Sequence, residues 1–394
     1  MLSLGLKFKK LVKTLGLRML ILGRPLFPKS FIINTFFRLT NVRLEFEDKK
    51  SKGEVTISKY KYGAKGALCV SIDFDLPVSR QLRTDWREAT TEILRLAEKH
   101  SVPMSWGMCG VLALNEPQIF NQIRNSTVPL DLGVHTFTHA DFSSPLCTND
   151  VARDEILKCM EVMKDVKRPV TFIFPWNRLG HLPLLREYGF VTYRGNKTAK
   201  LAYPSKAQQL WDVHGTYYLV ERSAEEVSAI LRLFDSAISY GCVLHLWSHP
   251  WDMHIDGNVG KFMERVLDPL FSYAIKKKKD GLLWICTMRD LANYCEAREF
   301  CRIERVEKTE DRIGFLVHCK IEGQRFDFPP SITLQISVPR GWKEIRVLVD
   351  DVEQRLGSSC LLTKRWWRSY LFLTLSFEEP THKVSLIKVD RRNI

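Results

Sequence analysis

The sequence lacks a Cys-x-x-Cys pair, an internal repeat and a low-complexity tract. Its ten cysteines are scattered, mostly within apolar runs, at positions 69, 109, 147, 159, 242, 286, 295, 301, 319 and 360. Isolated cysteines in apolar surroundings are typical of small buried side chains in a reducing compartment, and a secreted disulfide framework is disfavoured. We therefore expect a cytoplasmic protein.

Acidic residues are absent from residues 1–43, which carry nine of the chain's lysines and arginines, against a net charge of +14 overall. These cations interrupt every apolar run before it nears the roughly 20 residues of a spanning helix. The run Met19–Gly23 is also shorter than the apolar core of about 7–15 residues in a secretory signal. Two interpretations remain open for this leader: peripheral contact with the inner face of an anionic membrane, or a basic tail that is disordered or packed on the folded part. Nucleic-acid binding is not indicated, because no recognisable module accompanies the charge.

Strand and helix patterns alternate along the middle of the chain. The predicted strands are Ala67–Ile72, Val102–Gly110, Val128–Val134, Val170–Trp176, Phe190–Arg194, Val243–Trp247 and Leu282–Cys286. The predicted helices are Asp85–His100, Pro117–Arg124, Asn149–Val166, Leu182–Tyr188, Ala224–Tyr240, Lys261–Lys278 and 287–299. Such alternation implies right-handed βαβ units and a parallel sheet, and seven or eight units suit a barrel.

After about residue 300 the pattern changes to short strands separated by turn residues. We expect a small β-sandwich over 301–394, after a leader over 1–52 and an α/β domain over 53–300. The predicted strands are Gly314–Ile321, Ser331–Pro339, Glu344–Asp350, Tyr370–Phe377 and Lys383–Val389. The aromatic residues Trp366, Trp367 and Tyr370 suit either a sugar-stacking platform or ordinary packing.

Two short motifs follow predicted apolar strands and carry side chains that bind metal ions. His135 and His139 are four residues apart after one strand, and Asp73 and Asp75 lie at the end of another. One carboxylate and two imidazoles supply three ligands and leave coordination positions open, which is the arrangement of a catalytic metal site. In a barrel the carboxyl ends of the strands converge on one mouth. The candidates for that mouth are Asp73, Asp75, His135, His139, Trp176, Asn177, Arg178, Arg194 and His249.

With these motifs in order, residues 60 to 298 resemble the polysaccharide deacetylases of carbohydrate esterase family four, the NodB-type domain. The resemblance is based on the segments 73–75 (Asp-Phe-Asp), 133–139 (Gly-Val-His-Thr-Phe-Thr-His), 174–177 (Phe-Pro-Trp-Asn) and 249–250 (His-Pro). The second segment is the most specific of the four. The resemblance implies a distorted (β/α) barrel of seven or eight strands that uses a divalent metal to hydrolyse N-acetyl or O-acetyl groups on sugars.

Carried over residue by residue, the resemblance gives Asp75, His135 and His139 as ligands of one divalent metal ion. Zinc, cobalt, nickel and iron all suit two histidines and one aspartate. Asp73 then resembles the general base and His249 the general acid. Residues of the third motif and the following strand are expected to bind substrate, namely Trp176, Asn177, Arg178 and Arg194.

The chain also departs from the family pattern. Ile173 stands where many members have an arginine, and either Arg178 or Arg194 is left to supply that charge. The Trp-containing acidic motif that tunes the acid histidine has two candidates, Trp211-Asp212 and Trp251-Asp252. His245 lies four residues before His249, so both share one face of a strand and either could reach the mouth. We favour His249 as the acid, because it lies nearer the carboxyl end of the strand and precedes Pro250.

The resemblance predicts a metal-dependent amidohydrolase acting on carbon–nitrogen bonds other than peptide bonds. Its expected substrate is an acetylated amino sugar or polysaccharide, either free or linked to a nucleotide or lipid. One variant with the same chemistry is a deformylase of a lipid-linked amino sugar. The alternative from another class is a non-catalytic carbohydrate-binding or scaffold relative.

Overall fold

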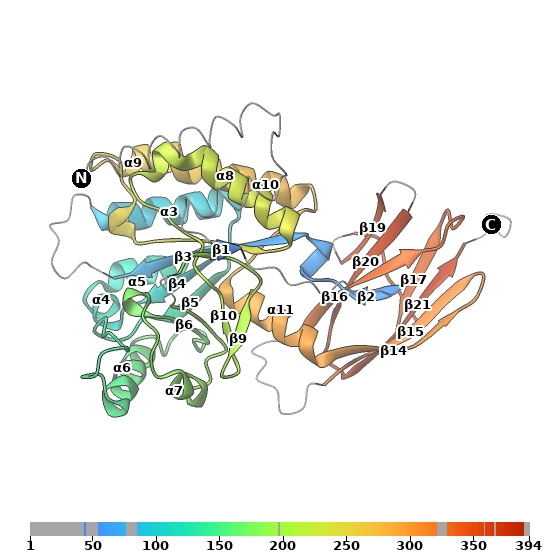
Figure 1. The fold of residues 1–394 in the computed structure, drawn as a ribbon, viewed down its shortest axis with the longest axis horizontal. Coiled ribbons are helices and arrows are strands. Elements are labelled where there is room, and N and C mark those ends of the chain that lie inside the picture. Colours follow the sequence, from blue (N-terminus) through green and yellow to red (C-terminus); the bar gives the residue numbers. More distant parts are fainter. Residues whose placement is uncertain are drawn as a thin grey trace, which may run out of the picture.

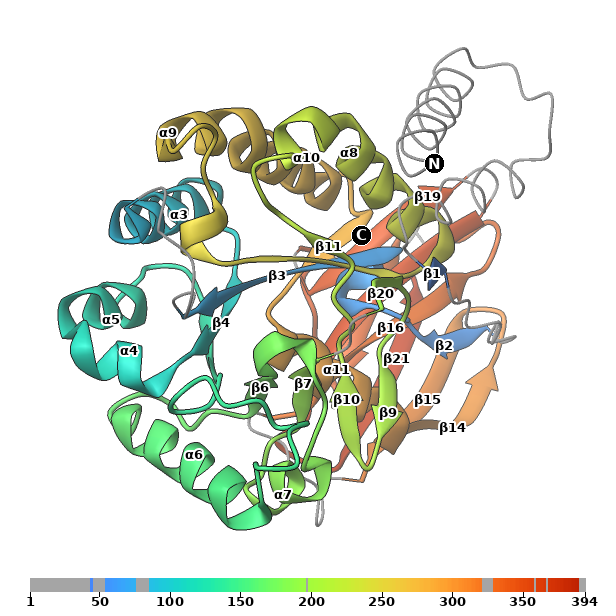
Figure 2. The ribbon, with the colours of Figure 1, turned by 60° about the vertical axis from the view of Figure 1, so that its left-hand side comes forward.

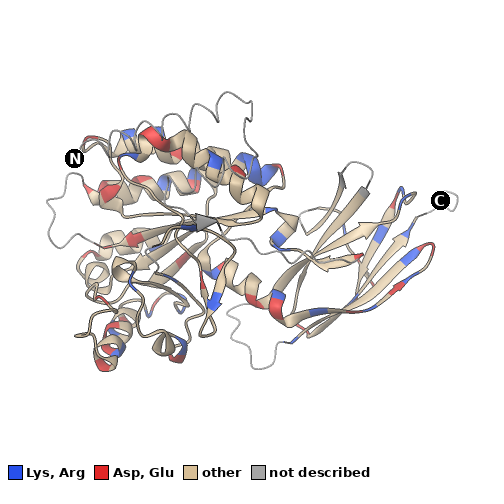
Figure 3. Cartoon of the chain, in the orientation of Figure 1, with Lys and Arg blue, Asp and Glu red and all other residues tan. Residues whose placement is uncertain are grey.

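The computed structural model consists of an α/β part and a β part (Figure 1). It describes residues 43–44, 54–75, 85–195, 198–320, 329–357, 359–365 and 368–389. The predicted leader therefore lies outside the described residues, except for strand β1 (Arg43–Leu44), which pairs with β8 (Lys200–Leu201). Basic and acidic residues are intermixed over both parts (Figure 3). No helix within these ranges is both long enough and apolar enough to cross a membrane.

A single curled sheet forms the centre of the α/β part. Its strand order is β11-β12-β3-β4-β5-β6-β7-β10-β9, and β13 (Leu283–Ile285) also pairs with β3. The helices lie around the outside of this sheet (Figure 2). The neighbours from β11 to β10 pair in parallel, and β9 pairs antiparallel with β10. This arrangement is the distorted barrel that the alternating pattern predicts.

The central strands lie where continuous apolar runs predict them. They are β3 (Gly66–Phe74), β4 (Met104–Met108), β5 (Leu130–Val134), β6 (Thr171–Ile173), β7 (Thr192–Arg194) and β12 (Val243–Ser248). Every residue of β3 is buried. A parallel strand covered on both faces needs apolar residues at successive positions, not at alternating ones.

Most predicted helices form close to their expected ends. Helix α3 (Trp86–His100) begins after Asp85, whose carboxylate accepts a hydrogen bond from the backbone N–H of Arg87. Such a cap satisfies one of the free N–H groups of the first turn. The other helices of the sheet are α5 (Pro117–Arg124), α6 (Asn149–Val162), α7 (Leu182–Glu187), α8 (Ser223–Tyr240) and α11 (Met288–Phe300).

The helix predicted over 261–278 has an irregular centre. It consists of α9 (Val259–Phe262), a π-helical turn η4 (Met263–Leu267) and α10 (Asp268–Lys279). Pro269 lies just after this turn. Proline lacks a backbone N–H, and its ring collides with the carbonyl four residues earlier, so a wider turn before it relieves the clash.

The segment between β7 and α8 contains strands that the sequence does not predict. They are β8, β9 (Ser205–Ala207), β10 (Leu210–Asp212) and β11 (Tyr217–Tyr218). Gln208 and Gln209 both adopt positive φ in the turn between β9 and β10. Such turns normally carry Asn-Gly or Asp-Gly, so the glutamines give no turn signal. Helix α4 (Gly110–Asn115) is also additional to the prediction.

The β part is the predicted sandwich, built from two sheets. One sheet has the order β14-β15-β21-β17-β18 and the other the order β19-β20-β16-β2. In chain order these are β2 (Val55–Ile57), β14 (Cys301–Lys308), β15 (Arg312–Cys319), β16 (Ser331–Val338), β17 (Ile345–Val349), β18 (Val352–Glu353), β19 (Cys360–Arg365), β20 (Arg368–Ser376) and β21 (Thr381–Lys388). Buried side chains of both sheets form one core. The boundary at residue 301 stays a prediction. Strand β2, however, precedes the barrel in the sequence, so the sandwich contains segments from before and after the barrel sequence.

Tyr294 of α11 joins the two parts through its buried hydroxyl. This hydroxyl donates to the carbonyl of Ser58, at 2.9 Å, and accepts from the backbone N–H of Thr333, at 3.3 Å. Ser58 also donates its backbone N–H to the carbonyl of Thr333, at 2.7 Å. Of the three aromatic residues predicted as a stacking platform or as packing in the β part, Trp366 and Trp367 lie outside the described residues. The third, Tyr370, is half-buried in β20.

We predict that Tyr294→Phe lowers the free energy of unfolding by about 1–3 kcal/mol, because two buried backbone groups lose their partner. Urea unfolding measures the change. Tyr273→Phe is the control, since the Tyr273 hydroxyl donates to Asp235 at the surface, where water can replace it. Equal losses in the two variants would contradict this account of the junction.

Candidate metal centre

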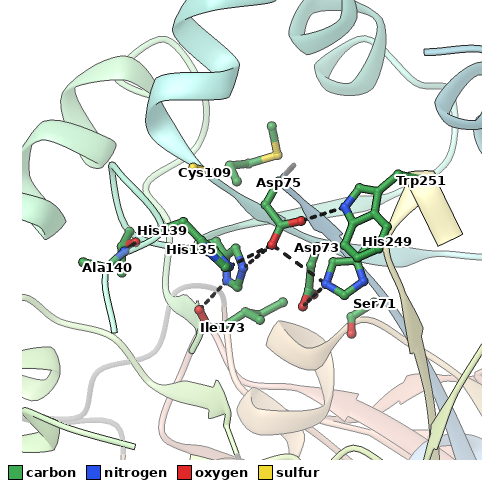
Figure 4. Close-up of polar contacts among 12 residues, drawn as sticks. Ser71, Asp73, Asp75, Cys109, His135, His139, Ala140, Ile173, His249 and Trp251 are labelled. Atoms are coloured by element: carbon green, nitrogen blue, oxygen red, sulfur yellow. Dashed lines mark hydrogen bonds and ion pairs between the residues drawn. The ribbon is translucent and has the colours of Figure 1, made fainter. Parts of the chain in front are cut away.

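The carboxyl ends of three strands bring the motif residues together (Figure 4). Asp73 and Asp75 lie at the end of β3, His135 and His139 follow β5, and His249 follows β12. The parallel register aligns these ends, because Ile72 is opposite Ser248, and Phe74 is opposite Met108, which in turn is opposite Val134. The sequence predicted this convergence from the strand ends alone.

Asp75, His135 and His139 form a compact group of ligand atoms. The Oδ2 atom of Asp75 lies 2.8 Å from Nε2 of His139 and 3.3 Å from Nε2 of His135. One ligand atom from each of the three residues lies within 4.8 Å of the others. The Nδ1–H of His135 donates to the carbonyl of Ile173 at 2.7 Å, which directs Nε2 at the group. A second hydrogen bond of this kind is typical of metal-binding histidines.

The two threonines of the second motif hold the turn that carries His139. Thr136 and His139 both adopt positive φ, at 61° and 63°. The hydroxyl of Thr136 accepts from the backbone N–H of Ala140, at 2.9 Å. The backbone and hydroxyl of Thr138 both donate to the carboxylate of Glu155, each at 2.7 Å. These hydrogen bonds offset the cost of an uncommon backbone conformation next to the site.

Gly133 is required for the close approach of β5 and β6. A Cβ atom at this position would lie 2.7 Å from the carbonyl oxygen of Thr171. Any side chain would push the two strands apart. The glycine of the motif therefore serves the packing of the strand that delivers His135.

Asp73 is held by a buried arginine and not by the candidate ligand group of Asp75, His135 and His139. The guanidinium of Arg194, at the end of β7, forms an ion pair with Oδ2 of Asp73. The side chain of Arg194 is 1% exposed. The other oxygen of Asp73, Oδ1, is buried and has no hydrogen-bond partner among the described residues. Of the two candidate arginines, Arg194 is the one that pairs with Asp73, whereas Arg178 is exposed and pairs with Asp141.

Charged neighbours keep both carboxylates ionised. Burial alone would raise the pKa of Asp73, but the charges of Arg194, His135 and His249 outweigh burial and lower it. Burial would likewise raise the pKa of Asp75, yet His249, His135 and His139 hold it well below its usual range. Both groups are therefore ionised at neutral pH and carry the negative charge that a cation needs.

His249 faces the two carboxylates. Its Nε2 atom lies 3.8 Å from Oδ2 of Asp73 and 3.8 Å from Oδ2 of Asp75. Its Nδ1 atom lies 2.9 Å from Oδ2 of Asp252 and 3.0 Å from the hydroxyl of Tyr218. Burial lowers the pKa of His249, but Asp75, Asp252 and Asp73 together raise it above the ordinary value. The imidazole is therefore biased toward its protonated form.

The segment after His249 completes this side of the site. The Trp251 ring stacks on the His249 ring at 4.5 Å, and its Nε1–H donates to Oδ1 of Asp75 at 3.0 Å. Of the two Trp-Asp candidates, Trp251-Asp252 is the one in contact with His249. The Asp212 carboxylate instead lies 3.0 Å from His214.

Among the predicted substrate-binding residues, Trp176 lies open beside the candidate ligand group, and the half-buried Asn177 follows it in the chain. The two residues lie in the turn η2 (Pro175–Asn177), both with positive φ. Trp176 is 52% exposed, and its ring lies 5.0 Å from that of His139. Arg194 is buried beneath Asp73. Sequence reasoning missed Ser71 and Tyr218, because neither belongs to a motif, and Tyr218 lies in a strand without a periodic pattern.

The chain is similar to several solved structures at low sequence identity. No protein-family model and no curated protein matches it. Among solved structures, it is similar to Puue allantoinase, with 13% identity over 58% of this chain and 89% of that chain, at a TM-score of 0.44. It is similar to the Bc1960 peptidoglycan N-acetylglucosamine deacetylase, with 16% identity over 58% and 89%, at 0.39. The BA3943 protein of Bacillus anthracis, a CE4 family pseudoenzyme, has 14% identity over 58% and 65%, at 0.39. The identities are low, so the function proposed below rests on the geometry of the site.

We predict that Arg194→Met lowers the free energy of unfolding by about 3–5 kcal/mol, because it leaves the Asp73 carboxylate buried and unpaired. Adding Asp73→Asn should recover part of the loss, since the unpaired charge is then removed. Urea unfolding of the metal-free protein measures both. The control is Arg178→Met, which removes an exposed pair and should cost less than about 1 kcal/mol. A similar loss in Arg194→Met and Arg178→Met would disprove the buried pair.

Proposed function

We propose that the chain is a metal-dependent hydrolase that removes an acetyl group from the nitrogen of an amino sugar. One observation carries this proposal: a three-ligand group lies beside both a buried carboxylate with one free oxygen and a histidine biased toward protonation. Hydrolysis of an amide needs a base for water and an acid for the leaving nitrogen. The three functions meet within one small site.

The donor set fits a divalent metal ion. Asp75, His135 and His139 would hold it, and the hydrogen bond from His135 to Ile173 already orients one imidazole for binding. Two nitrogens and one oxygen suit zinc, cobalt, nickel or iron and leave coordination positions open. When bound, such an ion lowers the pKa of a water molecule and polarises the acyl carbonyl.

Asp73 is the proposed general base. Its Oδ2 atom is occupied by Arg194, so the unpartnered Oδ1 atom is the one available to accept the proton of the attacking water. The depressed pKa keeps the carboxylate ionised before the reaction. The water oxygen then forms a bond to the acyl carbon as its proton passes to Asp73.

His249 is the proposed general acid. Asp252 and Tyr218 occupy its Nδ1 side, which leaves Nε2 facing the two carboxylates. When the bond between the acyl carbon and nitrogen breaks, the nitrogen leaves as an amine and takes a proton from Nε2. The carboxylic acid product carries the oxygen of the water.

The sugar is the proposed substrate class because of Trp176. An exposed flat ring beside His139 offers a surface for the apolar face of a sugar. A formyl group would undergo the same chemistry, so deformylation remains a variant of the proposal. The forms of substrate to compare are a polysaccharide and a saccharide linked to a nucleotide or a lipid. A lipid-linked substrate would fit contact of the basic leader with a membrane.

A non-catalytic scaffold is the less favoured function. A scaffold would have no use for a buried carboxylate that is kept ionised with one oxygen free, since such a group costs stability. The proposed enzyme uses that same oxygen in its first step.

We predict that purified protein binds about one equivalent of divalent metal, and that His135→Ala and Asp75→Ala lose it, because each removes a ligand. Elemental mass spectrometry measures the content. His181→Ala is the matched control, as this histidine contacts Asn149 and the Cys147 carbonyl outside the group and should leave metal binding intact. Absence of metal from the wild type, even after soaking with zinc or cobalt, would end the hydrolase proposal.

We also predict that Asp73→Asn retains the metal but lowers kcat by about 10²–10⁴-fold, because an amide cannot take the proton of water. The assay follows release of acetate and formate from a panel of acetylated and formylated amino sugars. Loss of metal together with activity would show that Asp73 is a ligand and not a base. Retention of wild-type kcat would refute the assigned role.

A further inference from the structure

A chain of hydrogen bonds continues from Arg194 into the interior, away from the metal-binding group. The Nη1 atom of Arg194 donates to Oγ of Ser71 at 2.8 Å. Oγ of Ser71 lies 2.8 Å from Nε2 of His245, and Nδ1 of His245 lies 3.1 Å from the carbonyl oxygen of Val213. Ser71 and His245 are fully buried. Arg194 therefore crosses the interior from β7 to Ser71 of β3, and His245 of β12 lies behind Ser71.

The Val213 carbonyl, the last group in this series of hydrogen bonds, fixes the direction of each hydrogen bond before it. The carbonyl of Val213 can only accept, so the proton of His245 resides on Nδ1 and its Nε2 accepts from the hydroxyl of Ser71. The oxygen of Ser71 then presents a lone pair to Arg194. Burial, together with the nearby charge of Arg194, lowers the pKa of His245 to about 3, in keeping with a neutral ring.

Packing restricts the arginine on its remaining sides. The Trp247 ring lies 4.4 Å from the guanidinium carbon of Arg194, a cation–π contact. Gly215 leaves room for this stack, since a Cβ atom there would lie 3.0 Å from Nε1 of Trp247 and 3.8 Å from Cδ of Arg194. The guanidinium is thus held between Trp247, Ser71 and Asp73, with Nη2 toward Asp73.

We infer that Ser71 and His245 are positioning residues of the hydrolytic reaction, which fix Arg194 and through it the carboxylate of Asp73. This inference rests on the proposed function, because it gives the hydrogen-bond chain a role in presenting Oδ1 of Asp73 to water. His245 contacts Ser71 and Val213, so it does not compete with His249 for the acid role. A base displaced by a fraction of an ångström loses rate without losing substrate affinity.

The first test compares two buried serines that are neighbours in the sheet. Ser105 of β4 is opposite Ser71 of β3 and is equally buried, but its hydroxyl donates to Asp131, at 3.0 Å, outside the chain that holds Arg194. We expect Ser71→Ala to lower kcat about tenfold with KM changed less than twofold and metal content unchanged. Ser105→Ala should keep kcat within twofold. Ser71→Thr, which retains a hydroxyl, should recover most of the lost rate.

The second test needs no substrate. Thermal unfolding of the metal-free protein compares Ser71→Ala, Asp73→Asn and the double variant. If the two residues act through Arg194, the losses of Tm are not additive, and the double variant loses clearly less than the sum. Additive losses would mean that Ser71 and Asp73 are independent.

The outcomes separate the inference from the proposed function. If the wild type hydrolyses no member of the panel, the proposed function fails, and the positioning role of Ser71 and His245 in the reaction fails with it. If the wild type is active but Ser71→Ala keeps its kcat, or loses no more than Ser105→Ala, the positioning role is overturned while the proposed function stands. Additive Tm losses overturn it in either case.

Discussion

Two carboxylates buried at the end of one strand set the main constraint on this fold. Asp73 lies on β3 and Asp75 directly follows that strand, two residues further on, so both side chains project from the same face, and each is less than 5% exposed. Burial of a charge without compensation is costly. The structure compensates them separately: Arg194 pairs with Asp73, and the histidines of the second motif lie against Asp75. This separation divides the interior into a half suited to a metal ion and a half suited to proton transfer.

The compensating side chains come from strands that are not neighbours of one another in the sheet. Arg194 projects from β7, the histidine pair follows β5, and His249 follows β12 on the other side of β3. Only a curled parallel sheet brings these carboxyl ends over one point. The site therefore depends on the whole sheet, and the unpredicted segment between β7 and α8 contributes to it as well, since Tyr218 of β11 contacts His249.

The sequence revealed the parts of the site that are local in the chain. Asp73 with Asp75, and His135 with His139, are short motifs after apolar runs, and their strands and most helices carry clear periodicity. Arg194 was assigned to substrate binding, because nothing in the sequence shows that a long side chain crosses the interior to Asp73. The pairing of β2 with β16 and the strands of 200–218 were missed for a related reason: they are two or three residues long, too short for a period to appear. The π-helical turn η4 was missed because the helical pattern over 261–278 continues through Pro269, the residue that signals an irregular turn.

His245 lies in β12 and His249 directly follows it, and the two show how depth in the sheet, more than spacing, determines chemistry. The sequence places both on one face, and it favours His249 for the acid role because that residue lies nearer the carboxyl end of the strand. In the register with β3, His245 is opposite Cys69, whereas the last paired residue before His249 is Ser248, opposite Ile72. At about 3.3 Å per residue, the four positions between the histidines amount to roughly 13 Å along the strand. His249 thus reaches the level of Asp73, where neighbouring carboxylates favour its proton, while His245 lies at the level of Cys69, beneath Arg194, where burial and a cation disfavour it.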